Sequence, residues 1–304
     1  MNEPAISEAG KVTAAIVVLY FPQWKVLQKL LDSLSRQLGK IYLISNGMDD
    51  QVKDALREFS DSCVITELPN NLGLGTALNV GIKQAIEDQF ELALLFDQDS
   101  SPPTNFLDDM IGEVKKIPKS NRTWAAVGPS FYDARSSGEI ILNQFKKNTK
   151  TETSINQHSS IISTDCLITS GMLLNLKRLR PFPKFDESFF VDQVDSEWCF
   201  RLVSLGYLLF GTTNVRLLHR LSDSIPKHLG SLTFLRYSPI RRYWYYKNSI
   251  RLIRCSYTPT HWRFRLAGIL AISFIPNLLM DKNYWQSFKM MTKGMFDGLW
   301  GVDE

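Results

Sequence analysis

The sequence has 304 residues, of which 44% are hydrophobic and 22% charged, with a formal net charge of +4. This balance excludes a disordered or fibrous chain and predicts one large domain with an appendage. The four cysteines lie far apart without a C-x-x-C pair, so neither a disulfide framework nor a structural zinc site is expected. The first residues lack a basic segment followed by an apolar one, so we expect no secretory signal and a cytoplasmic protein.

The first third of the chain alternates between apolar runs and amphipathic segments. The runs that predict strands are residues 13–20, 40–45, 63–68 and 91–96. The segments with helical spacing are residues 23–38, 50–59 and 75–89. Strands that alternate with helices in this way predict an α/β fold, with a mostly parallel sheet flanked by helices on both faces.

The fourth apolar run continues into the sequence LALLFDQDSSPP, which places Asp97 and Asp99 at the carboxyl end of a buried strand. Ligands bind at that edge of a parallel sheet. Carboxylates one residue apart point the same way in an extended chain, so both can bind one divalent cation. An isolated D-x-D is more often a solvated turn. Here the loops containing Tyr20, SNGMDD and PNNLGLG follow the other strands, so together they predict a nucleotide-binding crevice.

Several short motifs occur in an order that is typical of one enzyme family. They are VVLYFPQ, SNG, NNLGLGTALNVGI, FDQDS, TSGMLL and FDESFFVDQVDSEWCFR. Their order and spacing over residues 12–220 resemble the family 2 glycosyltransferases with the GT-A fold, which is Rossmann-like. The sequence LLFDQDS is most similar to bacterial rhamnosyltransferases that use dTDP-L-rhamnose to build O-antigen and other surface polysaccharides. The resemblance implies an inverting, metal-dependent transferase that acts on a saccharide or lipid-linked glycan.

The resemblance also implies which residues bind the donor nucleotide sugar. They are Tyr20, Asn46, Asn71, Gly73, Asn79, Asp97, Gln98 and Asp99. Mg²⁺ or Mn²⁺, bound by Asp97, Asp99 and His219, would stabilise the charge that grows on the diphosphate leaving group. His219 is equally compatible with a structural role in its loop. Ser45 stands where the family commonly has the Asp that recognises uracil or thymine, so the sequence does not decide between thymidine and uridine.

Inversion requires a carboxylate that accepts the proton of the attacking hydroxyl. The family usually has a Glu-Asp pair here, but in VDQVDSEW the second acid of the pair is replaced by Gln193. The base is therefore Asp192 or Asp195, and we favour Asp192 at the start of a predicted helix, with both acids on one helical face. A solvated first turn would also explain acids at this position. By resemblance, the acceptor side contains Ser170, Gly171 and Glu187, and Trp198 is expected in the core.

Three alternatives remain open at this point. A family 2 transferase could use another nucleotide sugar, such as a UDP-hexose or UDP-galactofuranose. A domain that binds a nucleotide sugar without turnover is favoured by Gln193 alone. A D-x-D phosphatase is disfavoured, because that class carries the motif on its first core strand, commonly followed by Gly-Thr, whereas here it ends the fourth predicted strand and SSPP follows.

The C-terminal part of the chain differs in charge from the rest. Residues 224–280 contain nine Lys and Arg but no acid, and RRYWYYKNSIRLIR interleaves aromatics with arginines as interfacial helices do. The apolar stretch 266–280 has 15 residues, fewer than the ~20 that span a bilayer. We expect a flexible N-terminus (1–11), a catalytic domain (12–222, with a nucleotide-binding half 12–103 and an acceptor half 104–222) and a basic helical region (223–304). This region is expected to dock on the inner face of the cytoplasmic membrane or to pack on the catalytic domain or in a homo-oligomer, and not to bind nucleic acid.

Overall fold

The predicted alternation of strands and helices is confirmed by a computed structural model, which describes residues 6–118, 123–132, 160–218, 227–229, 232–234, 237–279 and 283–301. After a short helix α1 (Glu8–Lys11), the strands are β1 (Thr13–Leu19), β2 (Ile41–Ser45), β3 (Cys63–Glu67) and β4 (Leu92–Asp97). The helices between them are α2 (Trp24–Ser35), α3 (Asp50–Ala55), which a 3-10 turn (Leu56–Phe59) extends, and α4 (Leu74–Glu87). Strands β1 and β2 are buried on both faces, as their unbroken apolar runs predict.

The described strands form one mixed sheet and a small hairpin. Eight of them lie in the order β3-β2-β1-β4-β7-β5-β8-β6. The second half of this sheet consists of β5 (Trp124–Tyr132), β6 (Ile161–Thr164), β7 (Met172–Asn175) and β8 (Leu208–Leu218). Strand β7 runs antiparallel between β4 and β5, so its first residues lie beside the carboxyl end of β4. The hairpin pairs β9 (Lys227–Leu229) with β10 (Leu232–Phe234).

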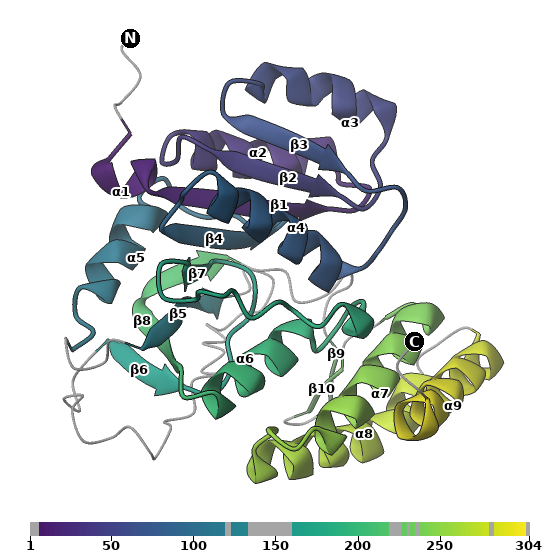
Figure 1. Cartoon of the computed structure of the whole chain (residues 1–304). Coiled ribbons are helices and arrows are strands. Elements are labelled where there is room, and N and C mark those ends of the chain that lie inside the picture. The colour runs from purple at the N-terminus through teal and green to yellow at the C-terminus, as the bar shows by residue number, and fades with distance from the viewer. Residues whose placement is uncertain are drawn as a thin grey trace.

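Helices cover both faces of the sheet (Figure 1). On one face, Ile16 of β1 belongs to a buried cluster with Leu78 of α4 and Trp198 of α6 (Val194–Ser204). On the other face, the next residue, Val17, packs with α2 and with α5 (Phe106–Val114). Successive side chains of a strand point to opposite faces, so each buried strand contributes to both clusters.

Three helices complete the described chain: α7 (Pro239–Arg254), α8 (Thr260–Leu279) and α9 (Tyr284–Trp300). Tyr246 and Ile250 of α7 are buried against Leu270 of α8 and Met291 of α9. The aromatic and aliphatic side chains of α7 therefore form a core between helices rather than a face for lipid. Within the described residues, no helix combines the length and the apolar composition needed to cross a bilayer.

Candidate functional site

The carboxyl ends of β1 and β4 meet at one edge of the sheet, where Val18 pairs with Asp97. The side chain of Gln98 joins the two ends, because the backbone N–H of Tyr20 donates to its Oε1 at 2.7 Å and its Nε2 donates to the Tyr20 carbonyl at 3.1 Å. The middle residue of the D-Q-D sequence thus fixes the loops that follow two strands. The Tyr20 ring remains half exposed at this edge.

Asn46 and Asn71 organise the glycine-rich loop before α4. The backbone N–H of Leu72 donates to Asn46 Oδ1 at 3.0 Å, and Asn46 Nδ2 donates to the Gly73 carbonyl at 3.1 Å. Asn71 Oδ1 accepts from the Gly73 N–H at 3.0 Å. The Asn46 amide, predicted to bind the donor, is buried here and binds the loop backbone through both of its polar atoms. A direct contact of Asn46 with the donor stays a prediction.

Gly73 allows this loop to pack against the segment that precedes α6. Its φ of +87° lies in the region that favours glycine, and an added Cβ would lie 2.7 Å from the Phe190 carbonyl oxygen. The next residue, Leu74, donates its N–H to the same carbonyl at 2.6 Å. Gly73 therefore joins the predicted donor loop directly to the chain that leads into α6.

Asn79 makes a second link between the two sides. Its Nδ2 donates to the Phe185 carbonyl at 2.9 Å and to Glu187 Oε1 at 3.0 Å, and its Oδ1 accepts from the Phe185 N–H. Asn79, predicted to bind the donor, and Glu187, predicted on the acceptor side, are thus brought together as partners. Their side chains hold α4 against the segment that precedes α6.

Ser170 and Gly171 lie beside the D-Q-D loop, as their place before β7 requires. Ser170 Oγ lies 2.6 Å from Ser100 Oγ and accepts weakly from the Asp97 N–H at 3.4 Å. Gly171, with a φ of +75°, donates its N–H to the Leu95 carbonyl at 2.7 Å. Both residues support the end of β4.

The two candidate bases have different backbone and side-chain environments. Asp192 (φ +56°) and Gln193 (φ +64°) lie before α6, which begins at Val194. The expectation that Asp192 and Asp195 share one helical face is therefore wrong, because the left-handed backbone at these two positions turns the chain before the helix starts. Arg241 of α7 lies 3.3 Å from Asp192 Oδ1, so Asp192 is paired with a cation.

Asp195 lies in the first turn of α6 and accepts the N–H of Ser196 at 2.7 Å. Burial raises the pKa of this carboxyl to about 6. The Ser196 hydrogen bond lowers the pKa, and the negative charges of Asp97 and Asp192 raise it further. Burial also raises the pKa of Asp192, but there Arg241 opposes it. The pKa of Asp195 is therefore raised in part by the charge of Asp97 in the D-Q-D sequence. Among the described residues, Asp195 has no cation partner.

Helix α7 holds the strained segment that carries Asp192. Asn248, which is fully buried, donates Nδ2 to the Val191 carbonyl at 2.6 Å and to the Asp192 carbonyl at 3.1 Å. Arg251 donates to the Ser188 carbonyl at 2.9 Å and to its Oγ at 2.7 Å. We missed these positioning residues in the sequence because the basic pattern of α7 suggested a membrane surface. The signal available was Asn248, a neutral amide within that basic helix.

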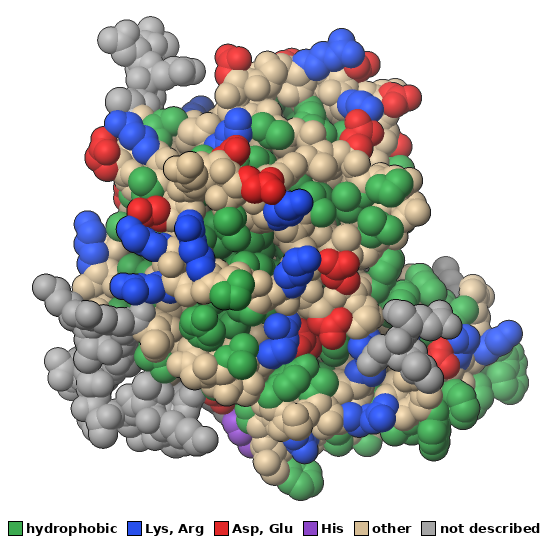
Figure 2. Space-filling view, in the orientation of Figure 1, with side chains coloured by type: hydrophobic (Ala, Val, Ile, Leu, Met, Phe, Trp, Pro, Cys, Tyr) green, Lys and Arg blue, Asp and Glu red, His purple; other side chains and the backbone are tan. Residues whose placement is uncertain are grey.

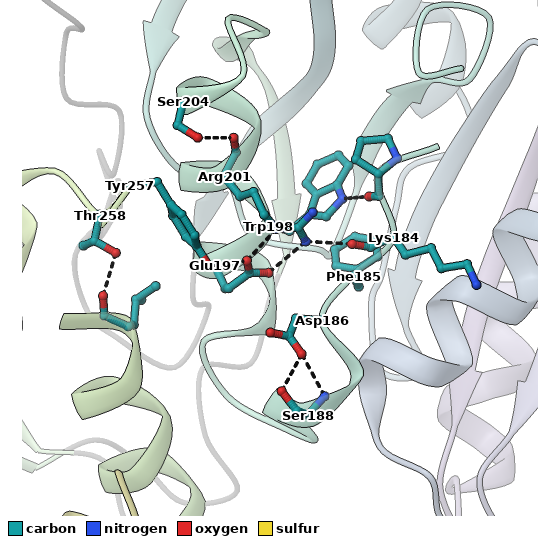
Figure 3. Close-up of polar contacts among 12 residues, drawn as sticks. Lys184, Phe185, Asp186, Ser188, Glu197, Trp198, Arg201, Ser204, Tyr257 and Thr258 are labelled. Atoms are coloured by element: carbon teal, nitrogen blue, oxygen red, sulfur yellow. Dashed lines mark hydrogen bonds and ion pairs between the residues drawn. The ribbon is translucent and has the colours of Figure 1, made fainter. Parts of the chain in front are cut away.

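A buried polar network anchors the first two turns of α6 (Figure 3). Glu197 binds Arg201 through two hydrogen bonds, of 2.6 and 3.0 Å, and accepts the Tyr257 hydroxyl at 2.7 Å. Arg201 also donates to the Lys184 carbonyl at 2.7 Å. Trp198 is fully buried in the core, as expected, and donates Nε1 to the Pro183 carbonyl at 2.6 Å. Both carboxylate oxygens of Glu197 are thus occupied by structural hydrogen bonds.

A partly enclosed cavity of about 250 Å³ opens beside both candidate bases. Asp192, Asp195 and Ser196 line one part of it, and Tyr245 of α7 and Arg265 of α8 line another. The rest of the lining consists of Gln193 and of apolar side chains from the chain at 166–168 and from α8. Carboxylates, a phenol and a guanidinium beside apolar surface are suited to a small polyhydroxylated ligand.

The D-Q-D sequence offers oxygen donors of the type that Mg²⁺ and Mn²⁺ prefer. Asp97 is the last residue of β4, and Asp99 follows two residues later. The negative charge of Asp97 contributes to the raised pKa of Asp195. Among the residues that the structure describes, no group of three or more His, Cys, Asp and Glu could hold a metal. His219, the third predicted ligand, lies outside the described residues. Two carboxylates fit an ion that completes its shell with water and phosphate oxygens.

Residues 15–174, more than half of the chain, match the family model described as glycosyl transferase family 2. The chain belongs to this family. The dTDP-rhamnosyl transferase RfbF of Shigella flexneri is 26% identical to this glycosyltransferase over 291 residues, which cover 95% of both chains.

Solved structures confirm the GT-A fold of this family 2 glycosyltransferase. Residues 1–349 of S. aureus TarS, in complex with UDP-GlcNAc, align with a TM-score of 0.59 at 15% identity, over 95% of this chain and 81% of that one. GalNAc-T7 with UDP, GalNAc and Mn²⁺ aligns with a TM-score of 0.59 at 12% identity, over 83% of this chain. The alignment covers 49% of GalNAc-T7, so this chain matches about half of that protein.

Proposed function

We propose that this glycosyltransferase transfers L-rhamnose from dTDP-β-L-rhamnose, with inversion, to a saccharide or lipid-linked glycan of a bacterial surface polysaccharide such as O-antigen. The observation that carries the choice of sugar is the relation to a dTDP-rhamnosyl transferase over 95% of both chains. The TarS and GalNAc-T7 structures hold uridine nucleotides, so a UDP-sugar is the alternative donor. The Tyr20 ring and the loops at Asn46 and Gly73 are the parts of the crevice assigned to the nucleotide.

We assign the base to Asp195 in preference to Asp192. The attacking hydroxyl must lose its proton near the donor phosphate, and Asp195 is the carboxyl whose pKa responds to Asp97. A carboxyl with a pKa near 6 is a stronger proton acceptor than an ordinary aspartate and remains ionised at neutral pH. Asp192 is held by Arg241 and closes the cavity on one side. Its charge helps to keep the pKa of Asp195 high.

The residues at the end of β4 fit a divalent ion. Asp97 and Asp99 would hold Mg²⁺ or Mn²⁺, which would stabilise the charge on the departing diphosphate when bound. GalNAc-T7, with a similar fold, was crystallised with Mn²⁺. Gln98 fixes the loop between these carboxylates through the Tyr20 backbone, so the pair is oriented before the donor binds.

The cavity beside Asp195 is the proposed acceptor subsite. Its volume of about 250 Å³ is near the lower end of ligand pockets, which begin at ~300 Å³, so it suits one sugar ring rather than an oligosaccharide. The ring would lie against the apolar wall from α8, with its hydroxyls facing Asp195, Tyr245 and Arg265. A lipid-linked acceptor would bring the enzyme to the inner face of the cytoplasmic membrane.

A thermal-shift screen of nucleotide sugars tests the choice of donor. A ligand that binds only the folded state raises the Tm by mass action, by an amount that grows with its affinity. We expect dTDP-L-rhamnose with Mg²⁺ to raise the Tm more than UDP-glucose, UDP-GlcNAc or UDP-galactofuranose at equal concentration. A larger shift with a UDP-sugar would reject rhamnose as the donor. Release of dTDP with an elongated glycan then separates a transferase from a domain that only binds.

A further inference from the structure

Helix α9 has two faces of opposite character. Its inner face consists of Ser287, Met291, Gly294 and Gly298, all of them buried. Its outer face carries large side chains at helical spacing, and three of them are mostly exposed: Trp285 (70%), Phe296 (60%) and Trp300 (66%). Phe288 and Leu299 are also exposed on this face. A soluble surface rarely groups so many large apolar side chains unless it binds something.

The small residues of the inner face fix which way the aromatic residues point. An added Cβ at Gly294 would lie 2.4 Å from the Tyr243 carbonyl, and at Gly298 it would lie 2.7 Å from the Lys247 carbonyl. Helix α9 therefore packs backbone to backbone on α7 and cannot rotate its aromatic face inward. Tyr243 also donates its hydroxyl to Asp297 at 2.7 Å. The exposure of the outer face is thus a consequence of tight packing on the other side.

Helix α8 extends the apolar surface. Its outer residues Phe264, Ile272 and Ile275 are exposed, whereas Leu266 and Leu270 face inward. The two helices meet where Phe274 of α8 and Phe288 of α9 make an edge-to-face ring contact at 6.2 Å. Figure 2 shows hydrophobic side chains beside Lys and Arg over the region of α9 at the lower right. We call these exposed residues of α8 and α9 the aromatic surface.

Among the described residues of α8 and α9, the charged side chains are mainly positive. Lys289 and Lys293 project from α9 and are exposed. Arg265 of α8 is also exposed, although it contributes to the lining of the cavity beside Asp195. Helix α8 contains no acid, and α9 contains Asp297, which pairs with Lys293 at 2.5 Å. Asp281, Asp303 and Glu304 flank α9 in the sequence and lie outside the described residues. Aromatic side chains flanked by Lys and Arg are the composition of helices that lie in the interface of an anionic membrane.

We propose that the aromatic surface docks this protein on an anionic lipid bilayer, with α9 lying in the plane of the headgroups. A second copy of the chain is a weaker choice of occupant, because a two-fold contact through this surface would bring the lysines of both copies together. The surface also differs from the one predicted from the sequence. The arginines of α7 bind within the protein: Arg241 to Asp192, Arg242 to the Asn277 carbonyl, Arg251 to Ser188 and Arg254 to Gly298.

Sedimentation of the full chain with vesicles tests this proposal. The vesicles are phosphatidylcholine alone, or phosphatidylcholine mixed with phosphatidylglycerol. We expect binding to the mixed vesicles and at least a tenfold weaker partition for the triple variant W285S/F296S/W300S. The variant K289E should weaken binding to the mixed vesicles only, because it reverses a charge at the surface. The matched control is L205S, which removes another exposed apolar side chain (62%), at the end of α6 and away from α8 and α9 in the sequence. This variant should bind as the wild type does.

Two further measurements make the outcome decisive. Circular dichroism and Tm must match between the triple variant and the wild type, which shows that the change removes a surface and not the fold. If the triple variant does not fold, the single variants W285S and W300S replace it. Wild-type protein that binds neither type of vesicle, or that binds unchanged after these substitutions, would overturn the proposal. Light scattering then measures the molar mass in solution. A dimer that becomes a monomer in the variants would show that the surface joins two copies instead.

Discussion

Asp195 carries a carboxylate in a site where negative charge is unfavourable. The raised pKa means that the folded state binds the proton more tightly than the unfolded chain. The stability that the protonated form contributes is fully present below pH ~4 and is lost as the pH rises through about 6. The ionised Asp195 carboxylate therefore lowers the stability of the folded protein at neutral pH.

This cost predicts a stabilising substitution at the proposed base. Asp195→Asn keeps an oxygen that can accept the Ser196 N–H but removes the charge. We expect the variant to be more stable than the wild type at pH 7 by up to about 3 kcal/mol, and close to it at pH 4. Urea unfolding in EDTA at both pH values measures the difference. A variant that is less stable at pH 7 would show that the Asp195 charge is well solvated or paired.

Helices α7 and α9 are joined by glycines whose backbones touch. Gly294→Ala places a methyl group 2.4 Å from the Tyr243 carbonyl, so α9 must move away from α7. We expect a loss of roughly 1–3 kcal/mol in the free energy of unfolding. Gly268→Ala in α8 is the matched control, because nothing lies within 4 Å of the added Cβ there. Helix propensity alone should stabilise that variant by up to ~1 kcal/mol. Equal effects from the two substitutions would contradict the observed packing of α9.

Helix α6 depends on the carboxylate of Glu197. Glu197→Gln keeps the size of the side chain but leaves the Arg201 guanidinium, which is mostly buried, without its anion. Removing one partner of such a pair costs roughly 3–5 kcal/mol. Tyr257→Phe is the milder comparison and should cost about 1.5–3 kcal/mol, since it removes one hydrogen bond to a charged group. Denaturant unfolding measures the stability of both variants. A larger loss of stability for Tyr257→Phe than for Glu197→Gln would disprove that the Glu197 carboxylate is the main anchor of this network.

At the scale of the whole molecule, the first half of the sheet was predictable because each strand is an apolar run and each helix has a clear spacing. The place of Asp97 at a strand end and the burial of Trp198 follow from the same local patterns. The backbone at Asp192 and Gln193 was not predictable, since neither residue is a glycine and their positive φ values depend on contacts with α7. Their partner Asn248 is distant in the sequence, and local pattern carries no information about such contacts.

The C-terminal helices show the same limit. Nine basic residues without an acid predicted a charged surface, but several of them bind carbonyl oxygens of the protein itself. Amphipathic spacing identified α7 as a helix and did not reveal that its partner would be protein. The exposed aromatic residues of α9 were present in the sequence, yet only the packing of Gly294 and Gly298 shows which side faces outward.

The central claim is that Asp195 is the base of an inverting transfer from a nucleotide sugar. The most direct measurement compares kcat and donor affinity for the wild type, Asp195→Asn and Asp192→Asn, with dTDP-L-rhamnose, Mg²⁺ and a saccharide acceptor. We predict that Asp195→Asn lowers kcat by roughly 10²–10⁴-fold and leaves the donor Kd nearly unchanged, because a base acts in the transition state. Asp192→Asn should retain far more turnover. Full turnover by Asp195→Asn, or a loss of that size in Asp192→Asn alone, would contradict the account.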